Sequence, residues 1–266
     1  MRLEAQKLEV WMVETRAVTE RQWSIMLSWL DSEELARAQR FQITEDRHSY
    51  VLAHALRRAV LAKKLNVSKR QISFSSTKNG LPTLNGLKQG PLYFSHSHTR
   101  GLALCVTTQL GSVGIDVELA RPMIADLNLL SGFVHLPHAG QRERELGSDP
   151  SKQFFFYWTL LEAYWKAAGT GLSLSHPPIK CRKGLEGTYE ISLVSTGPQE
   201  HPALGISLKC PTGWTASLVV NTINNINAHE LSLSKDWAIS YHGLDDLSWG
   251  GEILSCVESS KNLAVI

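Results

Sequence analysis

The stretch WTLLEAYWKAAGTGL, residues 158–172, is apolar for nearly a full turn in every direction when it is wound as a helix. A helix that is apolar all round is buried on all sides. Glu162 and Lys166 interrupt this pattern, and because they are four residues apart they lie on the same face. A buried carboxylate and a buried ammonium group need partners or a metal, since an uncompensated buried charge is costly. The pair therefore indicates either a functional site or a structural ion pair that fixes the packing of the helix.

The composition is that of an ordinary soluble globular protein. With 266 residues, the chain is long enough for one large domain or two small ones. Its net charge of +2 provides no general basic field, so we expect no nucleic-acid partner. The four cysteines form no C-x-x-C motif, which favours reduced thiols over a zinc site or a disulfide framework. Without an apolar leader or a long uncharged apolar run, the sequence predicts a cytoplasmic protein that does not span a membrane.

Helices come before strands in the first 120 residues. The apolar patterns predict a strand at 8–13 and then three helices at 19–30, about 32–41 and 44–65, with Thr19 as a cap of the first and Asp31 or Ser32 as a cap of the second. Short strands follow at 72–75, 91–95, 102–107 and 113–118, with a KNGLP turn at 78–82. Arg47, His54 and Arg58 share one face of the third helix, a row that is typical of a solvated surface.

The second half repeats this order. After a poorly patterned stretch at 121–150, the helix at 158–172 is followed by predicted strands near 189–194, 205–208 and 214–220, while residues 228–266 have no clear pattern. The order of helix and then strands therefore appears twice. It predicts an α+β fold, in which each half packs a helix on a small sheet.

The segment GSVGIDVE, residues 111–118, places two acids on one face of a strand. Ile115 and Val117 point to the core, and Asp116 and Glu118 point together to the opposite side. Two carboxylates so close repel each other unless a cation or protons intervene. Magnesium takes one or two such oxygen ligands and completes its shell with water and phosphates. The alternative is an edge strand with its acids in solvent, and a third carboxylate from Glu162 favours the metal site.

The segment YFSHSH, residues 93–98, ends a predicted strand. His96 and His98 share a face and are possible zinc ligands, although no cysteine or H-E-x-x-H partner accompanies them. Each can also be an ordinary core or surface histidine. An imidazole that donates to a phosphate, beside the hydroxyl of Ser95 or Ser97, is the more attractive interpretation.

Three motifs occur in a fixed order: FSHS at 94–97, GIDVE at 114–118 and the stretch at 158–172. Their order and spacing resemble the 4′-phosphopantetheinyl transferase superfamily, specifically its larger, monomeric surfactin-synthetase type. The segment LDSEELARAQRF at 30–41, followed by a long helix, is similar to the N-terminal region of that type. The resemblance extends over residues 8–225.

This resemblance implies an enzyme that transfers the 4′-phosphopantetheine arm of coenzyme A to a serine of an apo acyl, peptidyl or aryl carrier protein. It implies Mg²⁺ as cofactor, 3′,5′-ADP as the released product and a monomer. The implied fold has two α+β lobes related by a pseudo-twofold axis, residues 1–120 and 121–266. Each lobe packs a helix on a small antiparallel sheet, and the active site lies in the cleft between them.

The resemblance also assigns roles to individual residues. Asp116, Glu118 and Glu162 correspond to the magnesium ligands, and Asp116, Glu162 and Lys166 form the implied catalytic set. Glu162 would take the serine proton directly or through a water, and Lys166 would lie at the leaving phosphate. The residues implied to contact the coenzyme are Ser95, His96, Arg37, Arg40, Arg47, Arg58 and Lys78. The segment LSLSHPPI at 172–179 is implied to form part of the carrier-binding surface.

Two segments depart from the family pattern. In KNGLP, Leu81 stands where the family usually has a basic residue, and Lys78 is the nearest replacement. The stretch GFVHLPHAGQRERE at 132–145 lacks the usual aromatic-Ser-acidic pattern in a region that governs carrier docking. These departures leave open a non-catalytic module that binds coenzyme A or a carrier protein, and a zinc hydrolase using His96 and His98 is a third alternative. The three carboxylates and the lysine favour the enzyme.

Overall fold

The structure is a computed structural model of the chain, and it describes residues 6–86, 92–121, 127–184, 187–194, 203–222 and 237–247. The helices are α1 Glu20–Leu27, α2 Ser32–Gln39, α3 Thr44–Leu65, α4 Ala139–Leu146 and α5 Pro150–Ala167. Short 3-10 turns lie at Thr15–Ala17, Lys69–Gln71, Leu127–Leu130 and Leu244–Asp246. None of the helices in these ranges is long and apolar enough to cross a membrane.

The three N-terminal helices form where the sequence predicts them, and local capping explains why. The Thr19 hydroxyl accepts from the backbone N–H of Gln22 at the start of α1, and the Asp31 carboxylate accepts from that of Glu34 at the start of α2. Each cap satisfies a backbone donor that the first helical turn leaves without a partner. Helix α3 has the predicted bounds and ends at Asn66, whose backbone is left-handed with φ of 52°.

The strands form two main sheets and a small hairpin. A four-stranded sheet has the order β12-β1-β5-β4, a six-stranded sheet has the order β6-β11-β10-β9-β8-β7, and β2 pairs with β3. The strands of the first sheet are β1 Gln6–Glu14, β4 Tyr93–Thr99, β5 Leu102–Thr108 and β12 Trp237–His242. Those of the second are β6 Gly111–Leu119, β7 Val134–His135, β8 Ile179–Lys183, β9 Thr188–Leu193, β10 Ala203–Leu208 and β11 Trp214–Thr222. The hairpin consists of β2 Phe74–Ser76 and β3 Pro82–Leu84.

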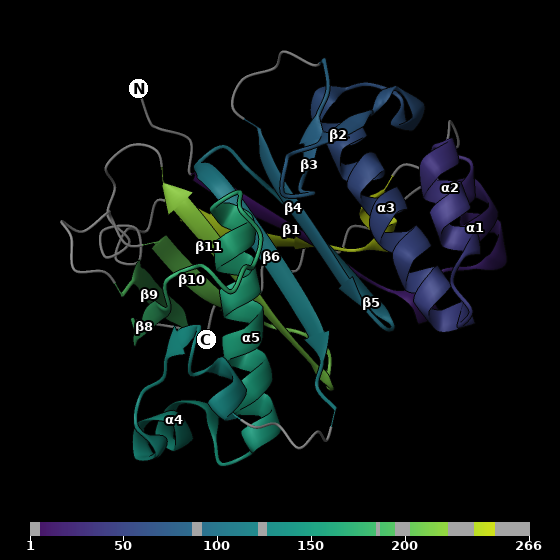
Figure 1. Ribbon diagram of the computed structural model, residues 1–266. Helices are drawn as coiled ribbons and strands as arrows, with labels where there is room; N and C mark the ends of the chain where they lie inside the picture. The colour runs from purple at the N-terminus through teal and green to yellow at the C-terminus, as the bar shows by residue number, and fades with distance from the viewer. Residues whose placement is uncertain are drawn as a thin grey trace.

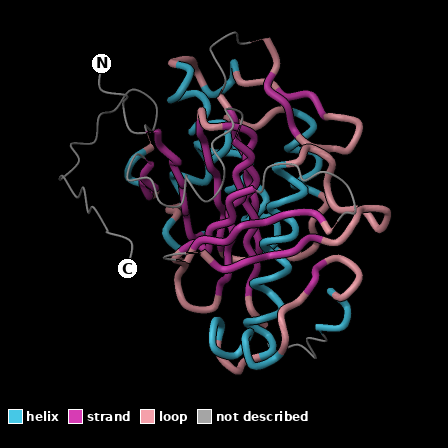
Figure 2. Tube along the Cα trace, turned by 90° about the vertical axis from the view of Figure 1, so that its left-hand side faces the viewer, coloured by secondary structure: helices cyan, strands magenta, loops and turns pink. Residues whose placement is uncertain are grey.

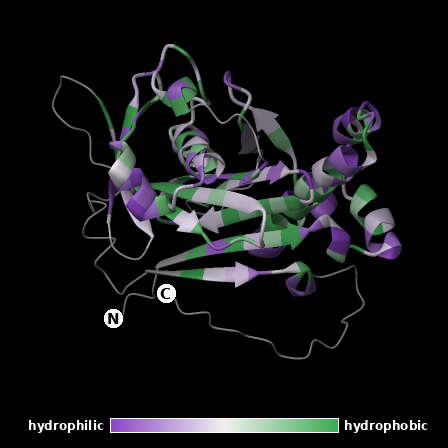
Figure 3. Ribbon diagram, turned by 90° about the horizontal axis from the view of Figure 1, so that it is seen from below, coloured by the Kyte–Doolittle hydropathy of each residue, from purple (hydrophilic) through white to green (hydrophobic). Residues whose placement is uncertain are grey.

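The two sheets pack against each other, and helices cover their outer faces. Residues of β1 and β5 form one core cluster with residues of β6, β10 and β11, while the alternate side chains of β1 and β5 pack on α1, α2 and α3. Helix α5 covers the other face of the second sheet. Figure 1 shows α5 in front of β6, β10 and β11. The helices α1, α2 and α3 are grouped to the right of β4 and β5. The strands run through the middle of the molecule (Figure 2), and many of their residues are hydrophobic (Figure 3).

The predicted helix at 158–172 is shifted toward the N-terminus. Helix α5 begins at Pro150, where the Asp149 carboxylate accepts backbone N–H groups of the first turn, and it ends at Ala167. The prediction missed the start because 121–150 was judged poorly patterned and 151–157 was assigned to no element. Gly169 and Gly171 end the helix, as the sequence predicts, because their left-handed φ angles of 77° and 67° cannot continue it.

The α+β class is confirmed, and each half has a long helix packed on a sheet. The sheets are antiparallel except for two parallel pairs, β1 with β12 and β7 with β8. Strand pairing also crosses the predicted boundary at residue 120, because β6 pairs with β11 and β12 pairs with β1. The division into two lobes therefore stays a prediction. The weakly patterned tail contributes β12, while 223–236 and 248–266 lie outside the described residues.

Candidate active site

The ammonium group of Lys166 on α5 binds to Asp116 on β6. Its Nζ lies 2.6 Å from Asp116 Oδ1, and it also donates to the backbone carbonyl of Ile115 at 3.2 Å. Both side chains are largely buried, so the ion pair lies between the helix and the sheet. A structural ion pair was one of two interpretations of Glu162 and Lys166 in the sequence, but the close contact of Lys166 is with another residue. Lys166 instead pairs with a residue fifty positions earlier in the chain.

Glu118 and Glu162 face the same charged region. Burial raises the pKa of both carboxyl groups, and the charge of Asp116 raises each of them further. Asp116 and Glu118 project from the same side of β6, as the strand alternation predicted, but Asp116 is buried rather than in solvent. The arrangement of three repelling acids around one lysine favours an additional cation.

The fit of this group to magnesium rests on Asp116. Its Oδ1 carries the bonds described, whereas its Oδ2 is buried and has no hydrogen-bond partner in the described part of the chain. A buried carboxylate oxygen without a partner is costly, and a hard cation is a suitable ligand for it. Within the same ranges, no three His, Cys, Asp or Glu side chains already converge closely enough to hold a metal. The donor set therefore fits magnesium in its chemistry, with ligands that must draw together around the ion.

Gly114 explains how α5 comes so close to β6. A Cβ atom built at Gly114 would lie 1.9 Å from the carbonyl oxygen of Ala163 and 2.7 Å from the backbone nitrogen of Ala167. Both atoms belong to the backbone of α5, so no side-chain rotation can make room. The missing side chain of Gly114 therefore sets the distance between the helix that carries Glu162 and Lys166 and the strand that carries Asp116.

Replacing Gly114 with alanine is expected to destabilise the protein by about 1–3 kcal/mol or more, because the helix must move away from the strand. The same movement should separate Lys166 from Asp116. Urea unfolding of the purified variant measures the loss. Gly243→Ala is a matched control, since a Cβ there meets nothing within 4 Å. Equal stability of the two variants would contradict the close-approach role of Gly114.

Strand β4 carries hydroxyls on one face and imidazoles on the other. Ser95 accepts from the backbone N–H of Ile115, Ser97 donates to Asp116, and Thr99 donates to Glu118, so these three point to β6. His96 and His98 point to α3, where His96 makes an edge contact with His54 and His98 with Tyr50. Ser95 and His96, which the resemblance implies as joint coenzyme contacts, therefore lie on opposite faces of the strand.

Both histidines of β4 are held in the neutral form. Burial, reinforced by nearby positive charges, lowers the pKa of His96 well below its ordinary value and that of His98 to about 4. A neutral imidazole can donate one hydrogen bond to a phosphate without carrying a charge. The zinc alternative gains no support, because no third ligand converges with these histidines among the residues that the structure describes.

The predicted basic residues come from several different elements. The exposed ones are Arg37 on α2, Arg40 at its C-terminal cap, Arg47 on α3 and Lys78 in the turn between β2 and β3. The Arg37 guanidinium lies 5.7 Å from the centre of the Tyr50 ring, which places it near the histidine side of β4. Beside Lys78, the Asn79 amide donates to the backbone carbonyl of Gly169 at 3.3 Å. The KNGLP turn therefore contacts the segment that follows α5.

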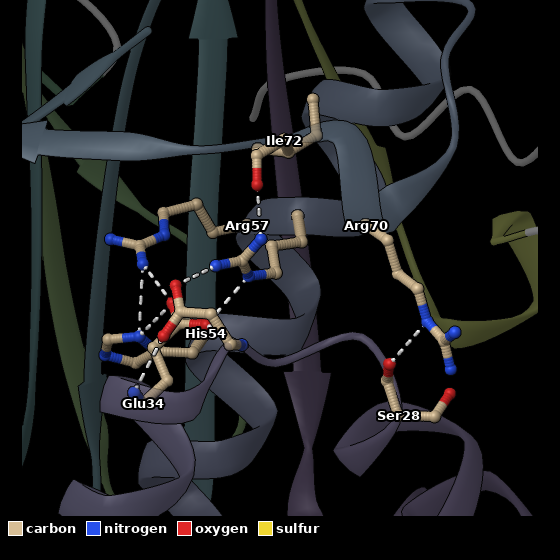
Figure 4. A network of polar contacts seen from close by, with 8 residues as sticks. Ser28, Glu34, His54, Arg57, Arg70 and Ile72 are labelled. Atoms are coloured by element: carbon tan, nitrogen blue, oxygen red, sulfur yellow. Dashed lines mark hydrogen bonds and ion pairs between the residues drawn. The ribbon is translucent and has the colours of Figure 1, made fainter.

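Arg58 is buried in an internal ion-pair cluster and does not form part of a solvated row. Its guanidinium contacts Glu34, Asp31 and the carbonyl of Ile72. Glu34 also binds Arg57 at 2.6 Å and His54 at 2.9 Å, as Figure 4 shows. Burial alone would raise the pKa of Glu34, but hydrogen bonds from His54 and Arg58 outweigh it and lower that pKa to about 2. With its donors engaged by these groups, Arg58 serves the fold.

Three residues with evident roles were missed or undervalued in the sequence. Ser97 was considered only as a phosphate contact. Its hydrogen bond to Asp116 joins β4 to β6, and such a contact between distant segments appears only in the tertiary structure. Arg57 lies off the apolar stripe of α3, so no sequence pattern marks it, yet the structure buries it beside Glu34. Gly114 belongs to the GIDVE motif, where a glycine within a strand indicates close approach of another backbone.

Comparison with known proteins adds two matches that cover most of the described chain. Residues 16–109 match the family model described as 4′-phosphopantetheinyl transferase, N-terminal, and residues 112–219 match that of the 4′-phosphopantetheinyl transferase superfamily. The chain belongs to the 4′-phosphopantetheinyl transferase superfamily. The second match contains the GIDVE strand and helix α5, so the superfamily segment coincides with the carboxylates and the lysine described above.

Individual members of the superfamily show moderate similarity. The chain is 35% identical to the 4′-phosphopantetheinyl transferase HetI of Nostoc sp. over 58% of its own length and 65% of the relative. It is 29% identical to a putative 4′-phosphopantetheinyl transferase of Synechocystis sp., over 54% of the chain and 58% of the relative. The transferase Sfp of Bacillus subtilis is 24% identical over 67% and 77% of the two lengths. The first two matches span less than two thirds of the relative.

Proposed function

We propose that this protein transfers the 4′-phosphopantetheine arm of coenzyme A to a serine of an apo carrier protein. The observation that carries the proposal is the buried Lys166–Asp116 pair, with Glu118 and Glu162 beside it, in the segment that matches the superfamily. A protein that only binds coenzyme A has no need for three repelling acids around a lysine. The three relatives described above are all named as 4′-phosphopantetheinyl transferases, which supports the same reaction.

Asp116, Glu118 and Glu162 would hold Mg²⁺ in this reaction. When bound, the ion neutralises negative charge on the pyrophosphate of coenzyme A and on the phosphate that leaves. The support is the unpartnered Oδ2 of Asp116 and the raised pKa of both glutamates, which a cation would lower.

Glu162 is the proposed general base. It would accept the proton of the carrier serine, directly or through a water, while the serine oxygen forms a bond to the β-phosphorus. The bond from that phosphorus to the bridging oxygen breaks, and 3′,5′-ADP departs with the bonding electrons. The support for this role is the place of Glu162, whose carboxyl group is half-buried beside Asp116 and Lys166 and feels the charge of both. Lys166, at the leaving phosphate, would stabilise the departing oxygen while continuing to orient Asp116.

The coenzyme would lie along β4, with its phosphates near Ser95 on one face and its 3′-phosphate toward His96 and Arg37 on the other. Arg40, Arg47 and Lys78 are exposed and free of the internal cluster that holds Arg58, so they are the candidates for additional phosphate contacts. The carrier protein would contact the segment after α5, where Leu174 is 89% exposed.

The remaining features of the proposal concern the whole molecule. We infer a monomer with two related lobes and the coenzyme in a cleft between them. Contacts from β4 to α5 support a site at the junction of the halves, because Lys166 Nζ lies 3.3 Å from Ser97 Oγ. Cys105, Cys181 and Cys210 are free thiols, which is consistent with a cytoplasmic protein.

One incubation tests the proposal. The full-length protein, coenzyme A and Mg²⁺ are mixed with an apo acyl carrier protein and an apo peptidyl carrier protein, and intact mass spectrometry follows each carrier. We expect the mass of one phosphopantetheine arm to be added to at least one carrier, and chelation of Mg²⁺ with EDTA to prevent it. Binding of coenzyme A without any mass change on a panel of apo carriers would instead support the non-catalytic module.

A further inference from the structure

The Ser97 hydroxyl connects the two charged groups of the site. It is 8% exposed, lies 3.3 Å from Lys166 Nζ and lies 2.8 Å from Asp116 Oδ1. The direction of both bonds is determined by chemistry. An ammonium group only donates, so Ser97 accepts from Lys166 and gives its single proton to Asp116.

The two bonds fill one oxygen of Asp116 and leave the other free. Oδ1 receives Lys166 and Ser97, whereas Oδ2 is buried and has no hydrogen-bond partner in the described ranges. The carboxylate torsion of an aspartate is soft, so the plane of the group is set by what binds it. With two donors on Oδ1, the lone pairs of Oδ2 have a defined direction.

We propose that Ser97 is a positioning residue which, together with Lys166, holds Oδ1 of Asp116 so that Oδ2 is presented to the divalent cation. This inference rests on the proposed function. Without the hydroxyl, the carboxylate can rotate until both of its oxygens share the Lys166 ammonium, and the oxygen meant for the cation is lost. Groups that orient a metal ligand in this way typically change metal affinity by about 10–100-fold.

A simpler role for Ser97 is to join two strands. Ser95 and Thr99, two residues away on either side, also bond to β6, and these three hydroxyls hold β4 beside it. The two roles differ in what they predict. A joining hydroxyl affects stability, whereas a positioning hydroxyl affects cation affinity even when stability is unchanged.

The experiment measures Mn²⁺ binding to the full-length protein by electron paramagnetic resonance, with and without coenzyme A. The variants are Ser97→Ala, which removes the hydroxyl; Ser97→Cys, which fills the space with a weak donor; and Ser97→Thr, which keeps the hydroxyl. Ser217→Ala is the matched control. Ser217 is buried on β11 directly opposite Asp116, and its hydroxyl bonds Thr159 Oγ1, which keeps its own bond to the carbonyl of Phe156.

We expect the dissociation constant for Mn²⁺ to rise about 10–100-fold in Ser97→Ala and Ser97→Cys. Ser97→Thr should restore it, and Ser217→Ala should bind as the unmodified protein does. The turnover number should fall with the affinity, and the KM for coenzyme A should change little, because Ser97 contacts the carboxylate and not the coenzyme.

Three results would overturn the inference. One is unchanged Mn²⁺ affinity in both Ser97→Ala and Ser97→Cys. Another is a loss of affinity that follows the loss of thermal stability and that Ser97→Thr does not restore, which would assign the hydroxyl to strand joining. The third is an unmodified protein that neither binds Mn²⁺ nor modifies any carrier, which overturns the proposed function as well. This result can be told apart from the other two, because the unmodified protein then lacks Mn²⁺ binding and carrier modification just as the variants do.

Discussion

Replacing Glu162 with glutamine is expected to slow transfer of the phosphopantetheine arm by about 1,000-fold, since loss of a general base alone costs roughly 10²–10⁴-fold. Glutamine keeps the size of the side chain and removes its charge, so both the base and one metal ligand are lost. Single-turnover mass spectrometry of the carrier protein measures the chemical step. Glu190→Gln is the matched control. Glu190 on β9 forms an ion pair with Arg182 on β8, away from this site.

The same variant should be more resistant to heat than the unmodified protein. Burial and the charge of Asp116 raise the pKa of Glu162, so its ionised form destabilises the folded state at neutral pH. A neutral glutamine removes that cost. The expected result is a higher Tm together with a loss of activity, measured in the absence of Mg²⁺. Near-normal turnover would contradict the role of Glu162 as the base. A Tm that falls would contradict its burial beside the charge of Asp116.

Replacing Glu34 with glutamine is expected to lower the free energy of unfolding by about 3–5 kcal/mol, the usual cost of removing one partner from a buried ion pair. Arg57 and Arg58 are nearly inaccessible and both bind this carboxylate, so the substitution leaves two guanidinium groups with too little negative charge. Urea unfolding at neutral pH measures the difference. Glu33→Gln, on the same turn of α2 but exposed, should change it by no more than about 0.5 kcal/mol.

This effect should depend on pH in one direction. Although burial opposes it, bonds from His54 and Arg58 lower the pKa of Glu34 from 4.5 to about 2. A carboxyl group with a lowered folded-state pKa stabilises the protein above its unfolded value and loses that contribution as the pH falls through the folded one. The stability difference between the unmodified protein and Glu34→Gln should therefore be full above pH 4.5 and shrink toward pH 2. A difference that is constant over this range would contradict the ion-pair assignment.

Most of the secondary structure could be predicted because its causes are local. The Thr19 and Asp31 caps, the apolar stripe of α3 and the alternation in β6 all act within a few residues. The strands at 179–183 and 237–242 were missed for the opposite reason. The first is short and largely exposed, so it carries little apolar signal, and the second pairs with β1 from the other end of the chain, which no local pattern indicates.

Part of the site could also be predicted. The strand alternation put Asp116 and Glu118 on one face, and the helical spacing put Glu162 and Lys166 on another. The partner of Lys166 could not be predicted. Glu162, four residues earlier on the same helix, is the nearest candidate in the sequence, but the structure pairs Lys166 with Asp116. The packing around Gly114 explains this pairing, since it brings the backbone of α5 directly against β6 and so places Lys166 beside Asp116.

The sequence by itself determined the α+β class, the positions of most helices and strands and, through three ordered motifs, the superfamily. Only the tertiary structure decided that Ser97, Asp116 and Lys166 form one hydrogen-bonded unit, and that Arg58 is buried in a cluster with Glu34 and does not face solvent. The physical reason is distance along the chain. Ser97 and Lys166 are 69 positions apart, and a contact between them depends on how two sheets and a helix pack, which no local pattern encodes.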